Sequence, residues 1–157
     1  MAEEKDPYYF REEVSNSDLS WLDKYWKPVD LVYDIEIAYR FGTLLDCMIT
    51  EPEKVDYYKF TCAGVQYTAE DFKKAEGMKR AFWRDEFCAL LANNSEYQKV
   101  SVHPNFVINH EGFSFTMAVR CKWDLFALPK LKITGDIKST TATTQKQFVD
   151  ACMHFDY

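Results

Sequence analysis

The sequence predicts a mixed α+β fold in which helices precede and follow a small antiparallel sheet. Two observations support this prediction. Apolar residues recur at helical spacing over residues 31–50 and 69–92. From Tyr97 onward the spacing changes to every second residue, which is typical of half-buried strands. With 157 residues, of which 47% are hydrophobic, residues 1–157 are expected to form a single domain with its own core.

The expected helices cover residues 18–26, 31–50, 69–92 and 143–154. Pro28 would end the first, and the Glu51-Pro52 pair would end the second, because proline lacks an amide hydrogen and restricts the residue before it. Thr68 and Asp71 have nearly the spacing and chemistry of a capping box. They therefore indicate where the third helix begins.

The expected strands cover residues 97–108, 113–122 and 131–138. The second is the clearest, because apolar residues alternate with small or polar ones along it. A turn over residues 109–112 joins the first two strands, since Gly112 can adopt a positive φ. A turn that contains Pro129 precedes the third strand. We therefore expect a three-stranded, mainly antiparallel sheet flanked by helices.

Charge is distributed unevenly along the chain. The net charge of −6 argues against a protein that coats nucleic acid through bulk charge. Residues 1–36 carry ten acidic and four basic residues, and the rest of the chain sums to zero. Residues 112–146 carry six basic residues and only two acidic ones, Asp124 and Asp136. These two carboxylates therefore lie in a locally basic segment.

The cellular setting is predicted from what the sequence contains and lacks. No apolar run is long enough for a membrane span, and the acidic N-terminus has no apolar signal region. The five cysteines are widely spaced, with no Cys-x-x-Cys pair, which fits reduced thiols rather than a zinc or iron–sulfur site. We expect a cytoplasmic protein that does not contact a membrane.

Residues 1–30 form an acidic extension rich in aromatic residues. Trp21, Tyr25 and Trp26 share one face of the first expected helix, around Leu22. Such rings can stack on bases or pack in a core or an interface. Because residues 1–36 carry a net charge of −6, we expect packing rather than contact with nucleic acid.

The residues that carry chemistry lie at the ends of the second and third expected strands. Asp136 and Lys138 are two apart on a strand, so their side chains point the same way. If the two strands pair antiparallel through the short turn between them, Asp124 lies near Asp136. Two carboxylates and an ammonium group would then converge. The alternative is that Asp136 and Lys138 form a simple surface ion pair.

A convergence of this kind predicts a site for Mg²⁺ or Mn²⁺, because both prefer carboxylate oxygen. A water on such an ion can attack a phosphodiester, and Lys138 can orient that water or stabilise the negative transition state. Hydroxyl groups that follow, Ser139, Thr140 and Thr141, are candidates for binding DNA phosphates at the start of the last helix.

The order of these motifs resembles the PD-(D/E)xK nuclease superfamily, most closely its exonuclease VIII (RecE-type) and RecB-type branch. Trp123-Asp124 is followed by eleven residues, then Asp136-Ile137-Lys138 and a Ser/Thr run. Upstream, residues 41–46 (Phe-Gly-Thr-Leu-Leu-Asp) and then residues 50–53 (Thr-Glu-Pro-Glu) are similar to a helix motif of that branch. The resemblance covers about residues 39–157.

The resemblance implies a restriction-endonuclease-like core. It implies that Asp124 and Asp136 are metal ligands and that Lys138 is catalytic. Asp46 stands where the branch usually has a metal-binding histidine, so it is implied as a third ligand; a helix-capping or solvated carboxylate is the alternative. Two features depart from the branch. Gln98 stands near the position of its first-strand glutamate, and no Gln-x-x-x-Tyr helix or fourth strand follows the last helix, so we expect the C-terminal part to be truncated.

The predicted function is therefore a Mg²⁺- or Mn²⁺-dependent exodeoxyribonuclease of phage or bacterial recombination that acts on linear duplex DNA. Its expected location is the cytosol of a bacterium or a phage-infected host. A second copy of the chain and a recombination protein are the further partners considered. The alternative is a catalytically inactive nuclease-fold module that binds DNA or protein.

Overall fold

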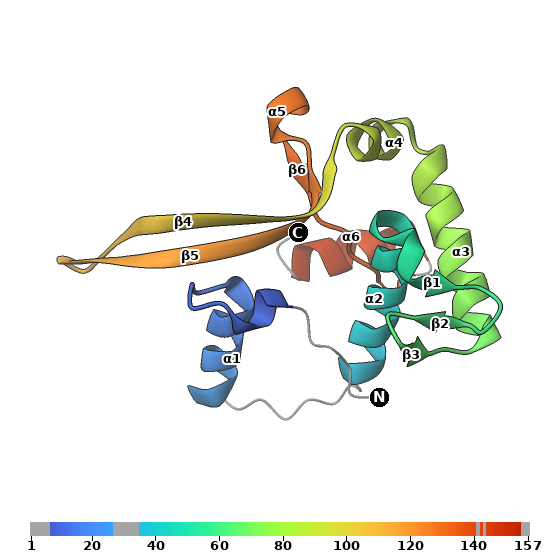
Figure 1. Ribbon diagram of the computed structural model, residues 1–157, viewed down its shortest axis with the longest axis horizontal. Helices are drawn as coiled ribbons and strands as arrows, with labels where there is room; N and C mark the ends of the chain where they lie inside the picture. The colour runs from blue at the N-terminus through green and yellow to red at the C-terminus, as the bar shows by residue number, and fades with distance from the viewer. Residues whose placement is uncertain (1–6, 27–34, 141, 143, 155–157) are drawn as a thin grey trace.

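The computed structural model describes residues 7–26, 35–140, 142 and 144–154. Its elements are η1 (Pro7–Phe10), α1 (Asn16–Trp26), α2 (Ile35–Thr50), η2 (Pro52–Lys54), β1 (Val55–Asp56), β2 (Thr61–Cys62), β3 (Val65–Gln66), α3 (Ala69–Arg84), α4 (Glu86–Asn93), β4 (Glu96–His110), β5 (Phe113–Phe126), α5 (Leu128–Leu131), β6 (Thr134–Gly135) and α6 (Gln145–His154) (Figure 1). The predicted mixed α+β fold is confirmed.

The main sheet has the strand order β4-β5-β6, and both pairings are antiparallel. Strands β4 and β5 extend away from the helices as a two-stranded arm (Figure 1). Glu111 and Gly112 adopt φ values of 47° and 84° at its tip, as a tight hairpin turn requires. The register shifts between His103 and Phe106, which places an irregularity at the expected kink.

The third strand is much shorter than expected. Residues 131–138 were expected to form it, but β6 consists of Thr134–Gly135 alone. The preceding segment forms the short helix α5 instead of a simple turn, because Pro129 suits the first turn of a helix. Lys132, with φ 62°, then ends α5 in the left-handed conformation.

The long helix expected over residues 69–92 is interrupted at Asp85. This residue is extended, with φ −74° and ψ 122°, and its side chain accepts a hydrogen bond of 2.8 Å from the amide of Cys88. It therefore ends α3 and caps α4. The capping box at the start of α3 is confirmed, because Thr68 and Asp71 each accept a hydrogen bond from the backbone amide of the other.

Two hydrophobic clusters support the elements that carry the candidate residues. The larger one joins α2 and α3 with a second, small sheet of order β1-β2-β3, which the sequence did not reveal. The smaller one joins α4 to the end of β5. Gly135 lies against it so closely that an added Cβ would be 2.8 Å from Leu91 Cδ2 and 3.2 Å from Leu125 Cδ1. A larger residue here would require Leu91 and Leu125 to shift, so glycine suits this close approach directly before Asp136.

The N-terminal segment contacts the sheet through Arg120. Val14 bridges to Val119 in parallel, with Val14 N 3.0 Å from the carbonyl oxygen of Ala118. The Arg120 side chain is only 2% exposed. Its guanidinium contacts the ring of Tyr8, the carbonyl oxygen of Arg11 and, at 3.0 Å, the carboxylate of Asp18. A single buried cation thus holds this acidic segment to β5.

The aromatic face of α1 lies outside the core. Trp21 and Tyr25 stack with ring centroids 5.8 Å apart, yet both are more than 60% exposed, and Trp26 is 74% exposed. The structure therefore does not place this face in the core, and packing in an interface, the other part of the expectation, stays a prediction.

One face of the β4–β5 arm is apolar. Phe106 pairs with Met117 and Ile108 pairs with Phe115, so these side chains share a face with Phe113. Phe113 is 77% exposed. No described helix is long and apolar enough to cross a membrane, and all five cysteines are free.

Candidate functional site

Gln98, Asp124 and Asp136 lie near one another where β4, β5 and the chain after β6 meet, and we call these three residues the row. Gln98 lies between Tyr97, which pairs with Leu125, and Lys99, which pairs with Trp123, so it is beside Asp124. The pairing of β5 with β6 ends at Leu125 and Gly135, and Asp136 follows directly after β6. The amide of Ile137 donates to Asp124 at 2.7 Å, and the charge of Asp136 acts on Asp124. The structure therefore brings the two predicted carboxylates near each other.

Asp124 occupies the centre of this row and is mostly buried. Its Oδ2 accepts a hydrogen bond of 2.7 Å from the backbone amide of Ile137, which also ties β5 to the chain after β6. Burial, reinforced by the charges of Asp46 and Asp136, raises the pKa of Asp124 to about 6. The hydrogen bond from Ile137 and the charge of Lys138 act in the opposite direction but do not offset the burial.

Asp136 and Lys138 form an ion pair, with Oδ2 and Nζ 2.7 Å apart. The two side chains are 59% and 54% exposed, so they are much closer to solvent than Asp124. The surface ion pair considered for this tripeptide is therefore present. It lies beside a buried carboxylate, and Lys138 contributes favourably to the charged form of that carboxylate. An isolated surface pair would not have this neighbour.

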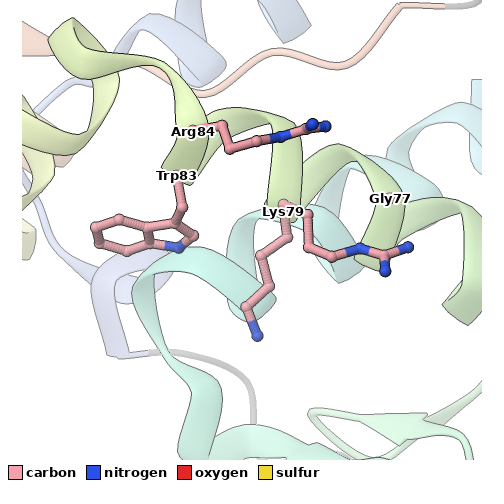
Figure 2. Close-up of a pocket in the computed structure, with 5 residues that line it drawn as sticks. Gly77, Lys79, Trp83 and Arg84 are labelled. Carbon is pink, nitrogen blue, oxygen red and sulfur yellow. The ribbon is translucent and has the colours of Figure 1, made fainter.

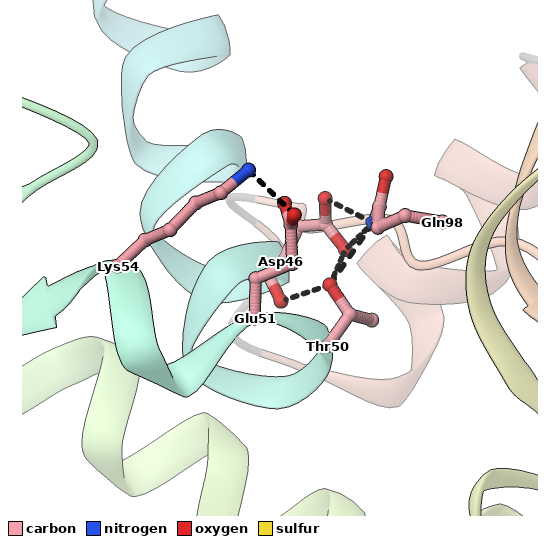
Figure 3. Close-up of polar contacts among 5 residues, drawn as sticks. All are labelled: Asp46, Thr50, Glu51, Lys54 and Gln98. Atoms are coloured by element: carbon pink, nitrogen blue, oxygen red, sulfur yellow. Dashed lines mark hydrogen bonds and ion pairs between the residues drawn. The ribbon is translucent and has the colours of Figure 1, made fainter.

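Asp46 reaches the row from α2 and contacts Gln98. Nε2 of Gln98 lies 3.2 and 3.0 Å from the two carboxylate oxygens of Asp46 and 2.9 Å from Oγ1 of Thr50 (Figure 3). Thr50 also donates to Asp46 Oδ1 at 3.1 Å. Burial raises the pKa of Asp46, although hydrogen bonds from Thr50 and Gln98 oppose that shift. Beside this group, Lys54 pairs with Glu51 at 2.5 Å.

Gln98 is the residue whose role the sequence did not reveal. It has φ 51°, which turns the backbone out of the regular ladder at the row. The side-chain amide of Gln98 then donates hydrogen bonds to the carboxylate of Asp46, which lies 52 residues earlier in the chain. The resemblance implies a glutamate near this position, and the structure places the side chain of Gln98 against Asp46 there.

The predicted phosphate-binding hydroxyls are only partly described. Ser139 lies beside α2, because its Oγ is 3.7 Å from the position that a Cβ on Gly42 would occupy. Thr140 Oγ1 accepts a hydrogen bond of 3.2 Å from the amide of Ala142. Thr141 lies outside the described residues. Thr144 caps α6 by accepting from the amide of Gln147 at 3.2 Å.

The donor chemistry at the row suits a hard cation, but the carboxylates are not gathered around one point. Among residues 7–26, 35–140, 142 and 144–154, no three Asp, Glu, His or Cys side chains form a group that could hold a metal ion. Asp46 is bonded to Gln98, and Asp136 is paired with Lys138. Asp124 and its neighbouring carboxylates therefore offer the oxygen donors that Mg²⁺ and Mn²⁺ prefer. Each of these carboxylates already accepts a hydrogen bond or forms an ion pair with another residue of the chain.

No protein-family model, curated protein or solved structure matches this chain.

Proposed function

We propose that this chain is a Mg²⁺- or Mn²⁺-dependent DNA nuclease with a restriction-endonuclease-like core, of the exodeoxyribonuclease type that acts on linear duplex DNA in phage or bacterial recombination. The observation that carries this proposal is the row itself. Two carboxylates lie near each other where β5 meets the chain after β6, a lysine pairs with the outer one, and burial together with the charge of a third carboxylate raises the pKa of the inner one.

Each residue has a distinct part in the proposal. Asp124 and Asp136 would hold the cation, and Asp46 is the third candidate ligand. When bound, the metal supplies a polarised phosphate and a coordinated water of lowered pKa. Lys138 lies next to Asp136, where its ammonium group can orient the attacking water or stabilise the added negative charge on the phosphate. Ser139 and Thr140 follow directly and offer hydroxyl groups to the DNA backbone.

The raised pKa of Asp124 supports a cation at this place. A mostly buried carboxylate with two carboxylate neighbours is costly to ionise, and a divalent cation would remove that cost. Perturbed titration is common at functional sites because such sites hold like charges together.

The experiment that tests the proposal is cleavage of linear duplex DNA with 5 mM Mg²⁺ or Mn²⁺. Wild type is expected to release nucleotides, whereas Asp136→Ala and Lys138→Ala should be at least ~100-fold slower, as is typical when a group that stabilises charge is removed. Asp150→Ala, at an exposed position of α6, is the matched control and should cleave like wild type. Equal rates in all four proteins would reject the assignment.

A second candidate function is a nuclease-fold module that binds DNA or protein without cutting it. The observation that favours it is the amide of Gln98, which donates to both oxygens of Asp46 where the resembling nucleases have another carboxylate. Isothermal titration with Mn²⁺ separates the two candidates. Binding of DNA together with no Mn²⁺ binding at millimolar concentration would favour the module.

A further inference from the structure

A line of basic residues follows the outer face of α3. Lys73, Gly77, Arg80 and Arg84 are four, three and four residues apart, so they lie within one narrow stripe of the helix. We call these four residues the α3 stripe. The core contacts of the helix are made on the other side, through Phe72 and Ala75. The α3 stripe therefore faces solvent, on the side of the molecule away from the β4–β5 arm (Figure 1).

The cations of the α3 stripe are not used for local ion pairs. Within the described part of the chain, Lys73, Arg80 and Arg84 form no salt bridge. Two nearby acidic residues of α3 are engaged elsewhere. Asp71 belongs to the capping box, and Glu76 accepts from Tyr57 and Lys79. The positive charge of the α3 stripe is therefore compensated only in part, by the charge of Glu76 near Arg80 and by Glu70, which lies beside Lys73.

The α3 stripe also breaks two rules of helix stability. Arg80 and Arg84 are like charges at i and i+4, which repel each other along a helix. Gly77 lies in the helix interior, where glycine is unfavourable, although nothing lies within 4 Å of the position that a Cβ would occupy. Packing thus does not require glycine here. Departures from local preference without a structural gain are typical of functional surfaces.

Two shallow hollows meet at Gly77. One has a volume of about 650 Å³ and is lined by Gly77, Lys79, Arg80, Trp83 and Arg84 (Figure 2). The other has a volume of about 640 Å³ and is lined by Ala69, Glu70, Lys73, Lys74 and Gly77. Together they follow the helix from Ala69 to Arg84, and five of their charged lining residues are basic while one, Glu70, is acidic. The missing side chain at Gly77 lets a ligand approach the helix backbone at its centre.

We propose that the α3 stripe binds the phosphate backbone of duplex DNA. This inference rests on the proposed function, because it takes duplex DNA as the substrate. From Lys73 to Arg84 the helix rises roughly 16 Å, which exceeds the ~12 Å width of the major groove. The cations at its ends therefore reach phosphates on both sides of that groove. Helix α3 packs on α2, the helix that carries Asp46, so DNA bound there lies on the same body as the row.

The test measures binding without cleavage. A fluorescein-labelled 25-base-pair duplex is titrated with protein in EDTA, and anisotropy is followed from 50 to 300 mM NaCl. The double variant Arg80→Glu/Arg84→Glu is compared with Lys24→Glu/Lys130→Glu, which makes the same change in net charge at exposed positions of α1 and α5. The milder pair Arg80→Ala/Arg84→Ala is measured as well, and circular dichroism and thermal melting check that each protein is folded.

The α3 stripe variant should bind at least ~10-fold more weakly at 100 mM NaCl, and the slope of log K against log salt should decrease by about 2, one for each lost phosphate contact. The control pair should retain the wild-type slope. Equal losses in both doubles, or an unchanged slope in the α3 stripe variants, would overturn the inference.

The cleavage assay with Mg²⁺ described above, carried out on the same variants, separates this inference from the proposed function. Wild type that binds DNA through the α3 stripe but never cleaves it with Mg²⁺ would remove the nuclease assignment and leave the DNA-binding surface intact. If wild type cleaves DNA and the α3 stripe variants bind and cleave it normally, the proposed DNA-binding role of the α3 stripe is rejected and the nuclease assignment is retained.

Discussion

Replacing Asp124 by asparagine should stabilise the metal-free protein at neutral pH. Asparagine keeps the shape of the side chain and an oxygen that accepts from the amide of Ile137. It removes a charge that is mostly buried and lies near Asp46 and Asp136. Removing this charge therefore relieves a cost that the folded wild type carries whenever the carboxyl is ionised.

The magnitude follows from the pKa. Burial raises the pKa of Asp124 from 3.8 to about 6. A shift of one unit corresponds to about 1.4 kcal/mol, so the ionised carboxylate lowers the free energy of unfolding by up to about 3 kcal/mol above pH 6. The native state holds the proton between pH 3.8 and about 6 while the unfolded state releases it, so this cost grows as the pH rises through that window.

The assay is urea unfolding in EDTA at pH 4 and pH 7.5, followed by the fluorescence of the four tryptophans. The free energy of unfolding of Asp124→Asn should exceed that of wild type by about 1–3 kcal/mol at pH 7.5 and by much less at pH 4. Asp150→Asn is the control for an exposed carboxylate. A variant that is less stable than wild type at pH 7.5, or a gain that is equal at both pH values, would refute the reasoning.

Three further predictions concern single side chains. Gly77→Ala should raise the free energy of unfolding by about 0.5–1 kcal/mol in thermal or urea unfolding, because the helix gains a better residue and the space is open; a loss would show that the position is constrained. Thr68→Ala should lower the free energy of unfolding by about 1 kcal/mol. Because the hydrogen bonds from Thr68 hold the pKa of Asp71 below 3.8, this loss of stability should be present at pH 7 and should decrease as the pH falls below 3.8. Gln98→Glu should destabilise the metal-free protein, because it sets a second carboxylate against Asp46, and should tighten Mn²⁺ binding about tenfold in calorimetry; unchanged Mn²⁺ binding would contradict a cation site here.

The candidate row could be anticipated from local patterns because it depends on short-range geometry. Asp136 and Lys138 follow β6 instead of lying on it, but they are close enough in sequence to form an ion pair, and the short connection between β5 and β6 brings Asp124 near them. The capping box was visible for the same reason, since it depends on residues three apart. Helical periodicity also located α1, α2 and α6 to within a few residues over the described chain.

The features that were missed depend on longer-range contacts or on very short elements. Strands β1, β2 and β3 have two residues each, which is too few for a period to be recognised. The interruption at Asp85 depends on one side chain that leaves the helix to cap the next. The bond between Gln98 and Asp46 joins residues 52 apart and needs a positive φ at Gln98, which no local propensity indicates.

The hydrogen bonds within the row indicate where a cation would lower the free energy most. Asp46 receives bonds from Gln98 and Thr50, so its charge is already partly balanced by amide and hydroxyl hydrogens. Asp124 receives one backbone bond from Ile137 and has two carboxylate neighbours. A divalent cation therefore relieves more repulsion at Asp124 than at Asp46. The affinity for Mn²⁺ should accordingly depend first on Asp124, and the contact of Gln98 with Asp46 sets how readily the third carboxylate can join.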